Sequence, residues 1–228
     1  MPTSSDETNS VPSWTIRPAR GGQSLEGAVR PTAYDAEWMP LRQSWRDAPE
    51  DRFRPGWARV RWDSEQLHVE AFFEGGDARN TATRLNERTW ESGDVCEVFV
   101  HSIGASYYVE VHVTPENQRL QVRLPWYADR IGPPAGPPIE SFMVHDPSWV
   151  QTSVGRYADG WIAHAVLPAN VILPGPGKLR PDAILRLAVC RYDYRGDTNP
   201  VLSSTALLST PRFHRWMEWH RAVLRAGE

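Results

Sequence analysis

The feature that most constrains the fold of this 228-residue chain is the alternation of apolar and polar side chains between Trp90 and Leu124. Successive side chains of a β-strand point to opposite faces of the sheet. One predicted face is apolar and comprises Cys96, Val98, Val100, Val109, Val111, Val113, Leu120, Val122 and Leu124. The other comprises Glu97, Phe99, His101, Tyr108, Glu110, His112, Arg119, Gln121 and Arg123. The pattern therefore predicts three strands with one core face and one face of hydrogen-bonding groups interleaved with rings.

The remaining pattern is also β-rich. Alternating segments cover residues 57–62 and 67–73, 150–156 and 161–167, 184–193 and 221–224, and turn residues separate them. Residues 78–89 and the proline-rich stretch 125–148 lack periodicity and are predicted to be loops. No segment sustains the 3.6-residue period of a helix. We predict an all-β fold, a two-sheet β-sandwich with jelly-roll character.

The composition of the chain limits its domain organisation and the classes of partner that it can bind. Residues 1–13 are polar and predicted to be a disordered tail, and residues 14–228 a single carbohydrate-binding-like domain. The net charge of -3 argues against a nucleic-acid partner. No apolar run approaches the roughly 20 residues of a membrane helix, and the first residues lack a signal-peptide pattern. We expect a soluble, cytoplasmic protein without a membrane partner; the oligomeric state is left open.

The metal-binding signals in the sequence are weak. Cys96 and Cys190 form neither a disulfide scaffold nor a cysteine cluster. His-x-x-x-His and Cys-x-x-Cys spacings are absent. His101 and His112 would bind a metal with a neighbouring glutamate only if their strands paired in a suitable register. The sequence therefore predicts no metal site.

Five short motifs carry a family resemblance. They are Ala58-Arg-Val-Arg-Trp-Asp63 with Leu67-His-Val69, Trp90-x-x-Gly93-Asp94-x-x-Glu97-Val-Phe99, Tyr107-Tyr-Val-Glu-Val-His-Val113, Gly160-Trp161 leading to Leu167-Pro168, and Arg191-Tyr192 followed by Phe213-His214. Their order resembles the family 9 carbohydrate-binding modules and the wider DOMON-like sandwich domains, over about residues 30–225. The resemblance implies a β-sandwich that binds sugar.

The resemblance also implies a site. In that family two tryptophans hold the sugar, with an acidic residue and an arginine nearby. Trp90 resembles the first tryptophan and Glu97 the acidic residue, while His112 stands where the arginine is expected. Trp216 and Trp219 are the candidates for the second tryptophan. The family commonly binds structural calcium through loop carboxylates, so a calcium ion stays open, although no loop here is rich enough in oxygen ligands to assign one.

We therefore predict a non-catalytic carbohydrate-binding protein that requires no cofactor. Its partner would be a small sugar or oligosaccharide on a concave sheet face. The predicted ligand-binding residues are Trp90, Glu97, Glu110, His112, Arg191 and Trp216. A competing interpretation is that Trp90 closes one end of the sandwich and the polar face is merely solvated.

Two further functions remain open. The first is an enzyme acting on a sugar or glycosylated metabolite, with Glu97 or His112 as acid or base. Glu97 and Glu110 would then resemble the two carboxylates of a glycosidase. The second is a haem protein of the DOMON-like type, with Met143 or His145 as axial ligand.

Overall fold

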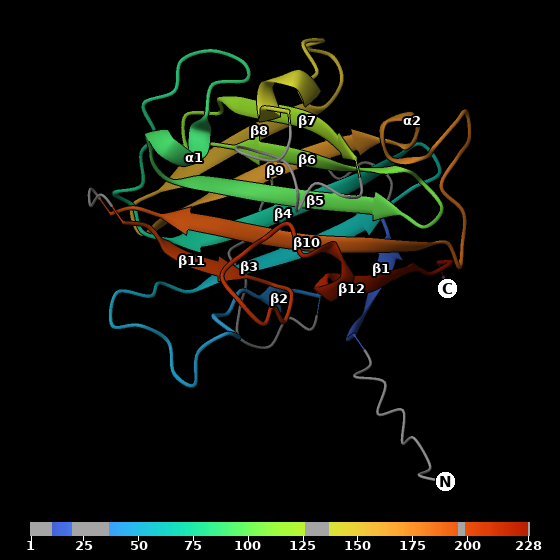
Figure 1. The fold of residues 1–228 in the computed structure, drawn as a ribbon. Helices are drawn as coiled ribbons and strands as arrows, with labels where there is room; N and C mark the ends of the chain where they lie inside the picture. The colour runs from blue at the N-terminus through green and yellow to red at the C-terminus, as the bar shows by residue number, and fades with distance from the viewer. Residues whose placement is uncertain (1–10, 20–36, 126–136, 196–198, 228) are drawn as a thin grey trace, which may run out of the picture.

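The computed structural model describes residues 11–19, 37–125, 137–195 and 199–227, and it shows an all-β protein (Figure 1). Twelve strands form one sheet: β1 (Ser13–Pro18), β2 (Met39–Pro40), β3 (Gly56–Trp62), β4 (Gln66–Glu74), β5 (Val95–Ser102), β6 (Tyr107–Val113), β7 (Arg119–Pro125), β8 (Gln151–Tyr157), β9 (Gly160–Pro168), β10 (Ile184–Asp193), β11 (Val201–Ser204) and β12 (His220–Leu224). The helices are single turns: α1 (Thr89–Ser92), η3 (Ile139–Phe142), α2 (Ala169–Ile172) and η4 (Trp216–Glu218).

The strands follow one hydrogen-bonded path, in the order β7-β6-β5-β10-β12-β1-β3-β4-β9-β8. β11 pairs with β10 and β2 with β3. β1 joins the two halves of the path, because it pairs in parallel with β12 on one side and with β3 on the other. The all-β prediction is confirmed. The described strands, however, form one large sheet that is nearly closed like a barrel, and do not divide into two separately bonded sheets.

The predicted hairpins are present with short turns. β3 and β4 pair with Val60 opposite Val69, and β8 and β9 pair with Val154 opposite Ala163. In the first turn, the Asp63 carboxylate accepts hydrogen bonds from the backbone N–H groups that follow it, which fixes the reversal of the chain. β10 has the predicted bounds.

The valine face of β5 and β6 is core, as predicted. Val98, Val100, Val109 and Val111 are all buried in one large apolar cluster. The same cluster contains residues of β3, β4 and β9 from the other half of the sheet. In Figure 1, β4 and β9 lie behind β5 and β10. The alternation in these strands therefore identified the interior side correctly.

The strand β7 is present where predicted, but the prediction of which face its side chains occupy was wrong. In the β6–β7 pairing, Glu110 is opposite Val122 and His112 is opposite Leu120. Directly paired residues share a face, so Leu120, Val122 and Leu124 lie with Glu110 and His112, not with the valines. Arg119, Gln121 and Arg123 correspondingly share the face of the valines.

The reason is a second apolar cluster on the outer face of this half of the sheet. Its buried members are Phe99, Tyr108, Leu120, Val122, Leu124, Ala188, Cys190, Ala206, Leu208, Phe213 and Trp219. The segment between β11 and β12 packs here, with Trp219 donating a 2.7 Å hydrogen bond from Nε1 to the Phe213 carbonyl. Because both faces are buried, apolar residues suit either one. The outer face is thus largely covered and not an open concave surface.

Two of the predicted irregular segments lie partly outside the residues that the structure describes. β1 begins at Ser13, the last residue of the predicted tail, while residues 1–10 lie outside the described residues. Of the predicted loop 125–148, residues 126–136 also lie outside them. No helix in the described ranges has the length and apolar character needed to span a membrane.

Candidate functional site

A cavity of about 520 Å³ opens on the outer face of β5, β6 and β10. It is bounded by these strands, by α1, by η3 and by the segment that precedes η4. The lining residues are Trp90, Glu97, Glu110, His112, Ile139, Tyr192, Pro211, Arg212, Phe213, His214 and Arg215. The structure thus brings together four of the six predicted ligand-binding residues: Trp90, Glu97, Glu110 and His112.

Glu97, Glu110 and His112 form a buried cluster in this cavity. Glu97 and His112 are directly opposite each other on β5 and β6, and Glu110 lies two residues before His112 on the same face. The Nε2 atom of His112 is 2.6 Å from Glu110 Oε1 and 3.3 Å from Glu97 Oε1. Its Nδ1 atom is 2.7 Å from the Thr89 hydroxyl of α1, so both ring nitrogens have partners.

Burial and charge separate the pKa values of these groups. Burial raises the pKa of Glu97 to about 8, opposed by the His112 charge and reinforced by that of Glu110. Burial also disfavours ionised Glu110, but the charges of His214 and His112 and the His112 hydrogen bond lower its pKa overall. The pKa of His112 is raised despite burial, because both glutamates favour the imidazolium. Near neutral pH this arrangement favours protonated Glu97 beside a charged His112–Glu110 pair.

Trp90 is held at the edge of the cavity by α1. It is half-buried, and its ring meets that of His112 edge-on at a centroid distance of 5.7 Å. Asn80 donates a 2.8 Å hydrogen bond to the Thr89 carbonyl, and the Tyr194 hydroxyl donates to the Trp90 carbonyl. A half-exposed indole on a fixed backbone beside buried polar groups is suited to stacking against a ligand ring.

Arg191 does not reach this cavity. In the β5–β10 pairing it is opposite Cys96, whereas Cys190 is opposite Glu97, so Arg191 lies on the other face of the sheet. There it is 1% exposed, donates to the Glu74 carbonyl at 2.9 Å and forms an ion pair with Asp193 at 3.3 Å. The structure gives Arg191 a role in holding strands together.

Trp216 also lies outside the cavity lining. Its ring packs 5.2 Å from the ring of His101, farther along β5. His101 is opposite Arg186 of β10, and its Nδ1 atom is 2.9 Å from the Tyr107 carbonyl. Neither Trp216 nor His101 therefore joins the Glu97 cluster, and the register removes His101 from the metal alternative considered above.

Sequence reasoning missed part of the cavity wall. Tyr192 faces the cavity because it is one residue beyond Arg191 and thus on the opposite side of β10. Phe213 and His214 come from the covering segment, and the Tyr108 hydroxyl is 2.7 Å from His214 Nδ1. These residues belong to the Arg-Tyr and Phe-His motifs, so the resemblance marked their positions without indicating which side chains turn inward.

The haem alternative gains no support from the described residues. Met143 is half-buried at the edge of β7, where it forms an isolated bridge with Val122, and His145 is exposed. Neither residue lines the cavity. An axial haem ligand must project into an enclosed pocket, and neither Met143 nor His145 does so.

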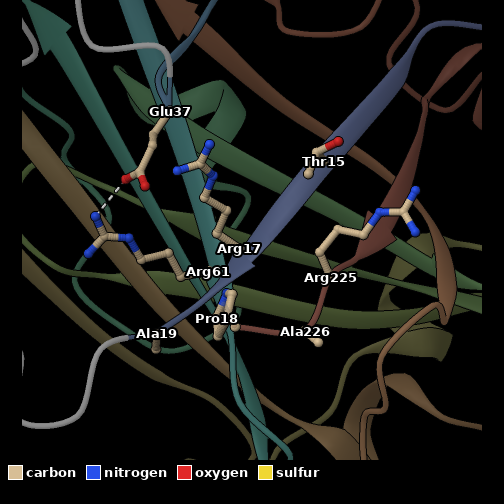
Figure 2. A pocket seen from close by; sticks show the side chains of 9 residues that line it. Thr15, Arg17, Pro18, Ala19, Glu37, Arg61, Arg225 and Ala226 are labelled. Carbon is tan, nitrogen blue, oxygen red and sulfur yellow. Dashed lines mark hydrogen bonds and ion pairs between the residues drawn. The ribbon is translucent and has the colours of Figure 1, made fainter.

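A second cavity, also of about 520 Å³, lies beside the end of β1 (Figure 2). Its lining includes Arg17, Arg61 and Arg225, and Arg61 forms a 2.6 Å ion pair with Glu37. No aromatic ring is among its described lining residues. The cavity at Trp90, with its rings and buried polar groups, is the stronger ligand-site candidate.

The fold is similar to those of several solved structures. A putative carbohydrate-binding protein from Bacteroides uniformis aligns with a TM-score of 0.70 and 16% identity, covering 95% of this chain and 100% of that one. A family 9 carbohydrate-binding module from Caldicellulosiruptor kristjanssonii aligns in complex with cellotriose (TM-score 0.62, 14% identity, 94% and 95% covered) and with glucose (0.60, 13%, 94% and 97%). No protein-family model and no curated protein sequence matches the chain. At these identities the similarity establishes the fold alone.

Proposed function

We propose that this protein binds a carbohydrate, without catalysis, in the cavity at Trp90. The observation that carries the proposal is the position of the half-buried Trp90 ring beside the buried Glu97–His112–Glu110 cluster in one cavity. The volume of about 520 Å³ falls within the usual range for small-molecule sites. The similarity in fold to family 9 modules supports the proposal.

The chemistry of the cavity suits a sugar. The C–H face of a pyranose packs on an indole, and its hydroxyl groups require fixed donors and acceptors. Trp90 supplies the stacking surface. Glu97, Glu110 and His112 supply the hydrogen-bonding groups, and Tyr192 and His214 extend the polar and aromatic wall. The ligand we favour is a small sugar or soluble oligosaccharide.

Two finer features belong to the same proposal. The two halves of the strand path would act as the two layers of a β-sandwich, since they share one buried cluster. A structural calcium ion, common in the family that the motifs resemble, remains part of the prediction. A rise in melting temperature on adding calcium to chelator-treated protein would test it.

The proposal is tested by calorimetry with glucose and cellotriose, the ligands of the structural neighbours. Trp90→Ala is expected to weaken binding by at least about 2 kcal/mol, as loss of a buried aromatic anchor does. Trp57→Ala is the matched control, because Trp57 is another half-buried tryptophan, packed in a different cluster. Unchanged affinity in Trp90→Ala with a large loss of stability would show that Trp90 is a structural plug.

The enzymatic alternative is separated by a second measurement. If Glu97 acted as a general acid, Glu97→Gln would abolish release of reducing sugar from oligosaccharides and retain their binding. A binding protein shows no turnover in the wild type, and the same substitution changes only affinity.

A further inference from the structure

We propose that Glu97, Glu110 and His112 bind a divalent transition-metal ion, of which Zn²⁺ fits best, at the floor of the cavity. This goes beyond carbohydrate binding and does not depend on it. The inference rests on the geometry of the three side chains, on a buried carboxylate oxygen without a partner, and on the hydrogen bond that orients the histidine.

The ligand atoms are already close together. Each of the three residues offers one ligand atom, and these atoms lie within 4.8 Å of one another. Around a tetrahedral zinc with bonds of roughly 2.0–2.2 Å, neighbouring ligand atoms are roughly 3.3–3.6 Å apart. The distance from His112 Nε2 to Glu97 Oε1 is 3.3 Å, and that to Glu110 Oε1 is 2.6 Å. A rotamer-scale adjustment of Glu110 therefore admits the ion.

Glu110 provides an independent indication of a ligand. Its residue is 2% exposed, and its Oε2 atom has no hydrogen-bond partner. Oε2 lies 3.7 Å from His214 Nδ1, beyond hydrogen-bond distance, and His214 Nδ1 is itself 2.7 Å from the Tyr108 hydroxyl. A buried polar atom without a partner is costly. A cation at the cluster would satisfy the carboxylate.

The charges are suited to a divalent ion. In the described part of the chain, no arginine or lysine forms an ion pair with Glu97 or Glu110. Metal binding would release the protons of Glu97 and His112. The two ionised carboxylates and the neutral imidazole that remain carry a charge of about -2, which a divalent ion neutralises. Mg²⁺ and Ca²⁺ prefer sites made only of oxygen ligands, whereas one imidazole with two carboxylates suits zinc.

The histidine is oriented as a metal ligand would be. A metal-binding histidine usually hydrogen-bonds its other ring nitrogen to a fixed acceptor, which holds the ring and selects the tautomer. Here Thr89 Oγ1 lies 2.7 Å from Nδ1, so it can accept a proton from Nδ1 and leave the Nε2 lone pair toward the carboxylates. The ion would take the place of the Nε2 proton that now bridges to Glu110.

Calorimetry with ZnCl₂ on chelator-treated protein tests the proposal. We expect one Zn²⁺ per chain in the wild type. Thr89→Val keeps the shape of the side chain and removes the orienting hydroxyl, and is expected to weaken Zn²⁺ binding by about 10- to 100-fold. His112→Gln removes a ligand and should weaken it by at least about 100-fold. His68→Gln, which changes a histidine of β4 whose Nε2 is 3.2 Å from Asp63, should leave the Zn²⁺ affinity unchanged.

Two results would overturn the proposal: no Zn²⁺ binding by the wild type, or equal Zn²⁺ affinity in the wild type and His112→Gln. Circular dichroism melting establishes that each variant is folded. If His112→Gln does not fold, the comparison of Thr89→Val with wild type decides, and equal affinity there overturns the proposal. Titrating glucose and cellotriose into chelator-treated and Zn²⁺-loaded protein keeps the two proposals apart, because loss of one binding activity leaves the other measurable.

Discussion

Replacing Arg191 by methionine separates a structural role from a ligand-binding role. Methionine keeps much of the apolar stem and removes the guanidinium. Burial lowers the pKa of Arg191 to about 10, partly offset by Asp193, so the group is still charged at neutral pH. The substitution therefore removes a buried positive charge from the side of the sheet opposite the cavity.

The size of the effect follows from three contacts. Arg191 donates to the Glu74 carbonyl at 2.9 Å, pairs with Asp193 at 3.3 Å and lies 5.1 Å from the Phe73 ring centre. A hydrogen bond from a charged group contributes about 1.5–3 kcal/mol, and a desolvated cation–π contact about 2 kcal/mol. The methionine regains part of this by apolar burial, and Asp193 keeps its bonds to Arg54. We expect Arg191→Met to lower the free energy of unfolding by about 3 kcal/mol.

Urea unfolding at neutral pH measures this loss, and calorimetry with glucose measures the affinity. We expect the stability to fall while the affinity of the folded variant stays within about twofold of wild type, a difference below 1 kcal/mol. Asp193→Asn, which weakens the same ion-pair network, should behave alike. A variant of wild-type stability that has lost glucose binding would refute the register argument and place Arg191 in the site.

Three further predictions concern stability. Val111→Ala should cost about 1–3 kcal/mol in urea unfolding, since Val111 is fully buried; a cost near zero would contradict its core position. Gly93→Ala should lower the free energy of unfolding by at least about 2 kcal/mol, because φ is 139° and the new Cβ would lie 2.3 Å from the Arg79 carbonyl oxygen. It should also weaken glucose binding by displacing α1. Gly104→Ala is the control: φ is 91° and the space around it is open, so it should cost about 1 kcal/mol and leave glucose binding unchanged. Burial, then the charges of His68 and Arg59, lower the pKa of His164 from 6.5 to about 4. The contribution of neutral His164 to the free energy of unfolding is therefore complete above pH 6.5 and is lost as the pH falls toward 4. Between pH 7 and pH 5, the free energy of unfolding should decrease by up to about 2 kcal/mol less in His164→Gln than in the wild type. An identical decrease in the variant and the wild type would exclude His164 as the cause.

Prediction from the sequence succeeded where the apolar side of the alternation is the side that joins the main core. In β5 and β6 the valines alternate with glutamates, histidines and rings, so the side that joins the main core was evident. It failed at β7, where leucine and valine alternate with arginine and glutamine in the same way. There the apolar residues pack under the segment containing Phe213 and Trp219, which lies about ninety residues later in the chain.

The residues of the candidate site also fall into those that the sequence could predict and those that it could not. Trp90, Glu97, Glu110 and His112 could be grouped from alternation and from the motif around Gly93, because they lie on one strand pair and the turn before it. Tyr192 and Arg191 are neighbours in the sequence, and only the pairing of β10 with β5 shows which of them faces the cavity. A shift of one residue exchanges the two faces, and nothing local to β10 specifies that register.

The sequence by itself determined the strands other than β1, β2 and β11, the two main hairpins and the interior side of β5 and β6, because strand alternation and turn chemistry are local. Only the tertiary structure decided that β1 joins the two halves of the sheet, that β7 turns its leucines outward, and that the outer face is covered except at the cavity. Those features depend on strand pairing and on packing between segments far apart in the chain. The energies of these long-range interactions cannot be deduced from a local sequence pattern.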